Sequence, residues 1–177
     1  DAINSDKEVT VASIRDENPV IFRKNHVLYN LKGEVPDEEY TTPLGLGDVK
    51  REGTDVTIVA WSRSVQRGLE VADLLADEGV QAEVVDPRTL RPLDDELIFD
   101  SVRKTNRCVV IEEGWRYAGF GAEIADRVQR ECFDDLDAPI VRVTAADVPM
   151  PYSRKLEKAY LPQPKQIIEA VNQVLYR

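Results

Sequence analysis

Charged and hydroxyl side chains follow four segments of the sequence that are predicted to be strands. In an open sheet, the carboxyl ends of parallel strands meet at one edge, and ligands bind in the crevice beyond that edge. The side chains at this edge are therefore the first candidates for chemistry. In chain order they are Ser62 and Arg63, Asp86 and Arg88, Glu112 and Glu113, and Thr144 and Asp147.

Two adjacent glutamates would suit acid and base catalysis, but their spacing argues against it. Successive side chains of a strand point to opposite faces of the sheet, so Glu112 and Glu113 cannot act together on one substrate atom. A role in fixing the following turn, or in an interface, is favoured. Arg88 follows the rigid Pro87. It is expected to pair locally with Asp86, or else to bind an acidic partner chain.

Nucleotide, serine and metal sites each lack part of their sequence pattern. The turn GFG at 119–121 could hold an anion at the start of the next predicted helix. However, Ile124 stands where the dinucleotide fingerprint needs its third glycine. The sequence has no G-x-S-x-G motif and no cluster of metal ligands. Its one histidine, His26, is expected on the surface or in an interface. No self-sufficient catalytic set is visible.

The two cysteines are not spaced like metal ligands. Cys108 lies in the apolar run CVVI, and Cys132 lies in a stretch with helical character. We expect two buried thiols in a reducing compartment, with a disulfide as the alternative.

Strands and helices alternate along most of the chain. Apolar runs predict strands, and apolar residues at helical spacing predict helices. This alternation predicts an α/β fold with an open, mostly parallel sheet and helices on both faces. The expected strands are 55–61, 80–86, 107–113 and 138–144, and the expected helices run from 62 to Gly79 and over 93–104, roughly 121–133 and 164–177.

The first 45 residues have a different character. Two short strand-like pieces, VTVAS at 9–13 and NPVIF at 18–22, precede a Pro-, Gly- and acid-rich connection at 30–47. Two strands cannot bury a core alone. Residues 1–45 are therefore predicted to be the remnant of a preceding domain plus a linker, and residues 46–177 to form a domain of their own.

Charge and hydropathy narrow the range of partners. The net charge of −10 argues against a nucleic-acid backbone, and fits either a basic protein partner or simple solubility. Glu131, Asp134, Asp135 and Asp137 form an acidic stretch that is either solvated or a docking patch. No apolar run is long enough to span a membrane, and the N-terminus lacks a signal pattern, so secretion is not expected.

The loop at 146–153, ADVPMPYS, follows the fourth predicted strand. Its two prolines make the loop stiff because they fix the backbone φ angle. Met150 and Tyr152 either form part of an interface or cover the core of the same domain.

Several motifs together resemble the beta subunit of the thiamine-diphosphate-dependent 2-oxo acid dehydrogenases, in family order and spacing over residues 9–177. The motifs EEGW and DVPMPY resemble the pyruvate branch of that family more than the branched-chain branch. The segments that carry the resemblance are EGTDVTIVAWSRSVQRGLEVADLL, VVDPRTLRPLD, SVRKTNRCVVIEEGW, GFGAEIADRV, LDAPIVRVTAADVPMPY and LEKAYLPQ.

The resemblance implies which sites this chain carries. Residues 1–45 would be the tail of a pyrimidine-binding domain, and residues 46–177 a transketolase-type C-terminal domain. The catalytic groups of the family lie upstream, so none is carried over. Lys24 departs from the usual glutamate and puts a family contact there in doubt. The residues carried over are Ser13, Asp16 and Asn18 for a structural potassium ion, and Asp137 and the C-terminal residue Arg177 for a partner.

The implied reaction is oxidative decarboxylation of pyruvate and acyl transfer to a lipoyl group, with thiamine diphosphate and magnesium. The implied partners are the alpha subunit, a second beta subunit and the basic subunit-binding domain of the dihydrolipoyl acyltransferase. The implied location is the bacterial cytoplasm or an organellar matrix or stroma. This segment would serve assembly and docking and be inactive alone. The alternatives are the C-terminal domain of another transketolase-like enzyme and a stand-alone small-ligand-binding domain.

Overall fold

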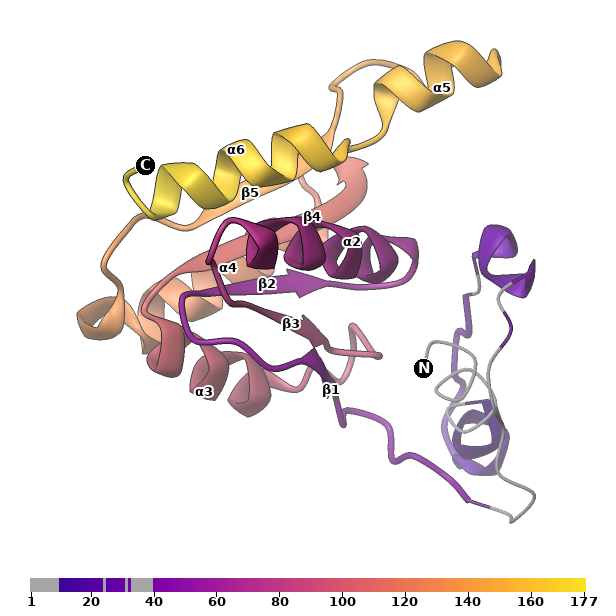
Figure 1. Ribbon diagram of the computed structural model, residues 1–177. Helices are drawn as coiled ribbons and strands as arrows, with labels where there is room; N and C mark the ends of the chain where they lie inside the picture. Colours follow the sequence, from indigo (N-terminus) through magenta and orange to yellow (C-terminus); the bar gives the residue numbers. More distant parts are fainter. Residues whose placement is uncertain (1–9, 24, 31, 33–39) are drawn as a thin grey trace.

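A five-stranded sheet forms the centre of the molecule (Figure 1). The computed structural model describes residues 10–23, 25–30, 32 and 40–177. The strand order is β1-β3-β2-β4-β5. The last four strands in this order run parallel, and β1 joins the edge antiparallel to β3. The strands are β1 (Asp48–Arg51), β2 (Val56–Ala60), β3 (Ala82–Asp86), β4 (Cys108–Trp115) and β5 (Val141–Ala145).

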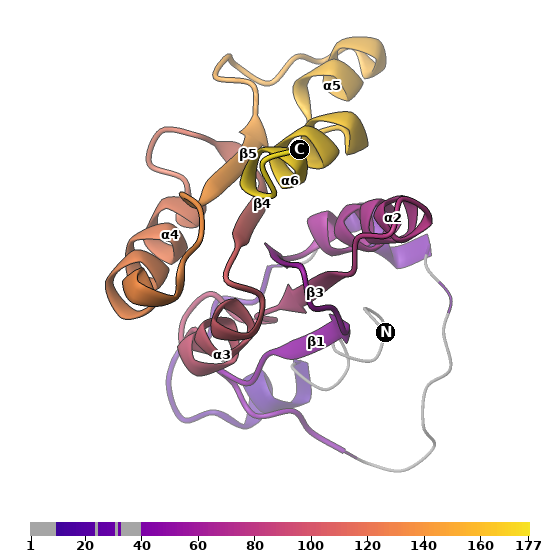
Figure 2. The same ribbon diagram turned by 60° about the vertical axis from the view of Figure 1, so that its left-hand side comes forward.

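Helices cover both faces of the sheet (Figure 2). One core lies beneath α2 and α6, and the other beneath α3 and α4. The predicted α/β fold with an open, mostly parallel sheet is therefore confirmed. The helices are α2 (Arg63–Asp77), α3 (Asp95–Thr105), α4 (Phe120–Glu131), α5 (Arg154–Tyr160) and α6 (Pro164–Val174), with short 3-10 turns η1 (His26–Asn30) and η2 (Phe133–Asp135).

The central strands β2, β3 and β4 carry mostly apolar residues because both of their faces are covered. In β2, Ile58 belongs to the core under α2 and α6, whereas its neighbour Val59 belongs to the core under α3 and α4. Both side chains are fully buried. This alternation of faces decides where each polar residue at the end of a strand must point.

The structure departs from the sequence prediction at the short elements. Strand β1 and helix α5 were not predicted, because a four-residue strand with three charged residues and a single short helix give little periodic signal. Residues 10–13, expected to be strand-like, are helical, so the β-branched residues there do not decide the conformation. Residues 18–22 form no strand. Lys24 lies outside the described residues.

Both cysteines are buried and free. Burial raises the pKa of the Cys108 thiol to about 12, and burial also raises the pKa of Cys132. The expectation of two buried thiols is confirmed, and the disulfide alternative is wrong.

The buried carboxylate of Glu83 in β3 links the sheet to α3. Glu83 is 1% exposed and accepts hydrogen bonds from the Ser101 hydroxyl at 2.5 Å and from the Gly53 N–H at 3.2 Å. Lys104 forms an ion pair with the same carboxylate. Ser101 also lies 2.8 Å from the hydroxyl of Thr57 in β2. Buried polar groups must be paired, and this network pairs a β3 carboxylate with helix and loop donors.

Replacing this carboxylate should destabilise the domain. Glu83→Gln keeps the shape but puts an amide where three donors need an acceptor, so we expect the free energy of unfolding to fall by about 1–3 kcal/mol. Urea unfolding followed by tryptophan fluorescence measures the change. Glu78→Gln, at an exposed position, is the matched control. Equal midpoints for the two variants would contradict the role of the network.

Candidate functional site

The candidate residues at the carboxyl edge fall into two separate groups. In the first, Asp48 of β1 forms ion pairs with Lys50 at 2.7 Å and Arg88 at 3.0 Å. Burial acts against ionisation of Asp48, but these two cations hold its pKa below the usual value. The backbone N–H of Arg88 donates to Asp86 at 2.9 Å, and burial raises the pKa of Asp86.

The expected ion pair between Arg88 and Asp86 is wrong: only the backbone N–H of Arg88 donates to Asp86, and the guanidinium pairs with Asp48. The sequence could not indicate this partner, because β1 was not predicted. Arg88 also has a positive φ of 55°, a conformation that is uncommon for a residue with a side chain. Its hydrogen bond to Asp86 and its ion pair with Asp48 hold it there.

The second group contains the two adjacent glutamates, which point to opposite faces as predicted. Glu112 lies on the same face of β4 as Cys108 and Val110, the face that α4 covers. There its carboxylate accepts hydrogen bonds from Arg142 at 2.6 Å and from the Gly121 N–H at 3.2 Å. Glu113 points toward α2 and lies 3.9 Å from Arg63. The predicted role of a glutamate in fixing the following turn is confirmed for Glu112, which is 2% exposed.

The GFG turn leaves room for this carboxylate. A Cβ atom added to Gly119 would lie 2.7 Å from the Glu112 carboxylate oxygens, and one added to Gly121 would lie 2.6 Å from Oε1. An anion at a helix N-terminus is favourable because the first N–H groups are unpaired. At α4 that anion is the protein's own Glu112, so the turn does not offer an open anion site.

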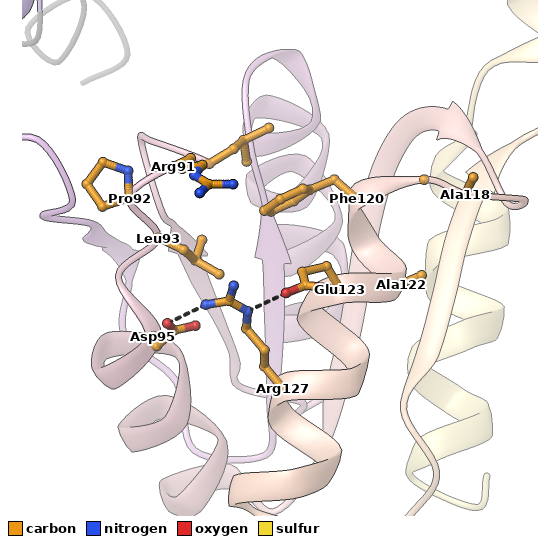
Figure 3. A pocket seen from close by; sticks show the side chains of 11 residues that line it. Arg91, Pro92, Leu93, Asp95, Ala118, Phe120, Ala122, Glu123 and Arg127 are labelled. Carbon is orange, nitrogen blue, oxygen red and sulfur yellow. Dashed lines mark hydrogen bonds and ion pairs between the residues drawn. The ribbon is translucent and has the colours of Figure 1, made fainter. Parts of the chain in front are cut away.

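A pocket of about 760 Å³ opens between the loop after β3 and the start of α4 (Figure 3). Three of its ionisable groups pair with one another: Arg127 contacts Asp95 at 2.6 Å and Glu123 at 2.8 Å. Arg91 also lines the pocket. Phe120, Leu93 and Pro92 supply apolar walls. Such a lining holds no pair of nucleophile and base.

The described residues also contain no group of three or more metal ligands. Magnesium, which the resemblance implies for the parent enzyme together with thiamine diphosphate, therefore finds no such ligand group among them. Among the residues expected to hold potassium, Asp16 accepts from the backbone N–H of Asn18 at 2.8 Å and from its side-chain amide at 3.1 Å. Ser13 precedes this turn at the end of the helical residues. The potassium site stays a prediction.

One of the two residues expected to bind a partner is linked to the chain after α6. Asp137 is half-exposed and forms an ion pair with Arg107 at 2.9 Å. The hydroxyl of Tyr176, the residue before Arg177, donates to the Asp137 backbone carbonyl at 3.2 Å. The partner-binding role of Asp137 and Arg177 stays a prediction. Within the acidic stretch, Asp135 lies 3.8 Å from Arg103.

The loop after β5 exposes its apolar side chains. Met150 is 60% exposed and Tyr152 fully exposed, so the alternative that they cover the domain's own core is wrong. Trp115 was not singled out from the sequence, yet its indole N–H donates to the Val148 carbonyl at 3.2 Å. His26 is exposed, as expected, and its ring lies 4.8 Å from that of Tyr29.

These features define an α/β domain whose charged groups at the strand ends mainly fasten its own loops. The chain matches the family model "Transketolase, C-terminal domain" over residues 45–167. The chain therefore belongs to the transketolase C-terminal domain family, as the motifs indicated. None of the described helices has the length and apolar character needed to cross a membrane.

Relatives of known name extend the match over nearly the whole chain. The mitochondrial pyruvate dehydrogenase E1 component subunit beta of Dictyostelium discoideum is 47% identical over 170 residues, covering 94% of this chain and 48% of the relative. The subunit of the same name from Rickettsia felis is 46% identical and covers 96% and 52%. The resemblance to beta subunits of this kind is confirmed, and the chain spans about half the length of these relatives.

One further relative and one solved structure are described by other names. The beta subunit of acetoin:2,6-dichlorophenolindophenol oxidoreductase from Bacillus subtilis is 46% identical and covers 96% of this chain and 49% of the relative. A solved structure described as a split gene transketolase, an inactive beta4 tetramer, superposes with a TM-score of 0.65 at 32% identity, covering 81% of this chain and 46% of that one.

The two glutamates should respond differently to the same substitution. Glu112→Gln removes the negative charge that pairs with Arg142 and accepts from the first turn of α4. We expect the free energy of unfolding to fall by about 3 kcal/mol. Glu113→Gln, one residue along the chain, should change it by less than about 0.5 kcal/mol. Urea unfolding of both variants measures the difference. Similar losses would overturn the assignment.

Proposed function

We propose that this chain is the C-terminal part of the beta subunit of a thiamine-diphosphate-dependent 2-oxo acid dehydrogenase that acts on pyruvate. Its role is subunit assembly and docking of the acyltransferase, with residues 1–45 as the tail of the preceding domain and 46–177 as the assembly domain. The observation that carries the proposal is the identity of 46–47% with named pyruvate dehydrogenase beta subunits over 94–96% of this chain.

In the parent enzyme, thiamine diphosphate with magnesium would supply the electron sink for decarboxylation. The residues described here contribute a rigid support for the parts that hold the cofactor. Asn25, in the segment before the domain, donates from its side chain to Glu113 at 3.4 Å. This contact supports the idea that the preceding domain rests on the carboxyl edge of the sheet. We also propose that Ser13, Asp16 and Asn18 contribute to a potassium site at this junction.

The proposed partners are the alpha subunit, a second beta subunit and the basic subunit-binding domain of the dihydrolipoyl acyltransferase. The hydrogen bond from the Tyr176 hydroxyl to the Asp137 carbonyl supports a docking patch made of the turn at Asp137 and the chain after α6. The net charge of −10 supports a basic partner, since complementary charge steers association. The proposed compartment is the bacterial cytoplasm or an organellar matrix or stroma.

Docking can be tested on the chain as it stands. We expect calorimetric titration with an acyltransferase subunit-binding domain to give binding that weakens as salt rises. Asp137→Lys should reduce this binding at least about tenfold, because it replaces an attractive charge with a repulsive one. Glu169→Lys, a charge reversal on the exposed side of α6, is the matched control. Absence of binding by the wild-type chain at low salt would contradict the docking role.

A stand-alone ligand-binding domain is the second candidate, and the pocket beside α4 is the observation that favours it. The same calorimeter can titrate thiamine diphosphate and nucleotides into the chain. Binding that Phe120→Ala abolishes would support this candidate. We expect no heat, because Arg127, Asp95 and Glu123 of the pocket are already paired with one another.

A further inference from the structure

One arginine joins the segments that make up the proposed docking patch. Arg107, just before β4, is only about a quarter exposed. Its Nε–H donates to the Val174 carbonyl at the end of α6, at 3.2 Å. Its Nη2 forms the 2.9 Å ion pair with Asp137, and its Nη1 donates to the Thr105 carbonyl at 3.4 Å. The same guanidinium therefore contacts the end of α3, the turn at Asp137 and the end of α6.

A tyrosine makes a second link between the same segments. The Tyr176 hydroxyl donates to the Asp137 carbonyl at 3.2 Å, and Tyr176 itself has a positive φ of 55°. The following N–H, from Arg177, donates to the Asn172 carbonyl at 3.0 Å. The first bond links the chain after α6 to the turn that holds Asp137, and the second holds that chain against the end of α6.

The turn at Asp137 is fixed from its other side as well. The Asp137 N–H donates to the Asn106 carbonyl at 2.9 Å, and the Asn106 side chain donates to the Asp135 carbonyl at 2.8 Å. The backbone of the turn is therefore held by Asn106, and its carboxylate and the chain after α6 are held by Arg107 and Tyr176.

We propose that Arg107 and Tyr176 are positioning residues of the docking patch, which hold the turn at Asp137 and its carboxylate in the arrangement that a basic subunit-binding domain recognises. This inference rests on the proposed docking function. A half-exposed carboxylate without a partner would move among rotamers, and binding would have to order it. Arg107 orders it in advance, which favours affinity without adding a contact to the partner.

Two substitutions test the positioning role without changing the net charge. Arg107→Lys keeps the cation but loses the planar group that reaches both Asp137 and the Val174 carbonyl. Tyr176→Phe removes one hydroxyl that donates one hydrogen bond. We expect each to weaken binding of an isolated acyltransferase subunit-binding domain about threefold to tenfold, as for the loss of one or two hydrogen bonds. The slope of affinity against salt should stay unchanged.

Matched controls make the same exchanges away from the patch. Arg154→Lys and Tyr117→Phe alter exposed side chains in α5 and in the loop before α4, and both should bind like wild type. Thermal unfolding of every variant gives the folded fraction at the titration temperature. Hydrogen exchange at the Arg177 amide should be faster in Tyr176→Phe than in wild type.

The outcomes separate the two proposals. A wild-type chain that fails to bind overturns the docking function and the inference with it. Equal binding by wild type, Arg107→Lys and Tyr176→Phe overturns the positioning role and leaves docking intact. A loss that disappears once binding is expressed per folded molecule also overturns the positioning role.

Discussion

The ion pair between Glu112 and Arg142 is the interaction on which the carboxyl edge of the domain depends. It joins β4 to β5 inside the α4 face, and the same carboxylate accepts from the first turn of α4. The glycines of the GFG turn leave it space, and Arg142 also donates to the Arg116 carbonyl. Breaking such a pair leaves an uncompensated buried charge, so the strand order, the turn and the start of α4 are coupled.

The same use of charge recurs along the chain. Glu83 fastens β3 to α3, the ion pairs of Asp48 hold the loop after β3, and Arg107 ties the end of α6 to the turn at Asp137. Side chains that could form an active site at the strand ends are thus already engaged in holding loops.

The sequence predicted the central layers and the opposite directions of Glu112 and Glu113, because burial on both faces and the alternation of a strand are local patterns. It did not predict Arg142 as the partner of Glu112, since the register of β4 against β5 is set by tertiary packing. The sequence also did not predict β1, whose Asp48 forms the ion pair with Arg88. Asp137 and Arg177 were assigned from the resemblance alone. No sequence pattern indicated a role for Arg107.

The central claim is that this chain supports and assembles a catalyst whose reactive groups lie elsewhere. The most direct measurement is pyruvate-dependent reduction of 2,6-dichlorophenolindophenol, with thiamine diphosphate and magnesium present. It is made for this chain alone and for this chain mixed with the alpha subunit and the upstream half of the beta subunit. The account predicts no turnover by the chain alone and turnover in the mixture. Turnover by the chain alone would contradict it, and turnover of acetoin but not pyruvate by the mixture would correct the substrate.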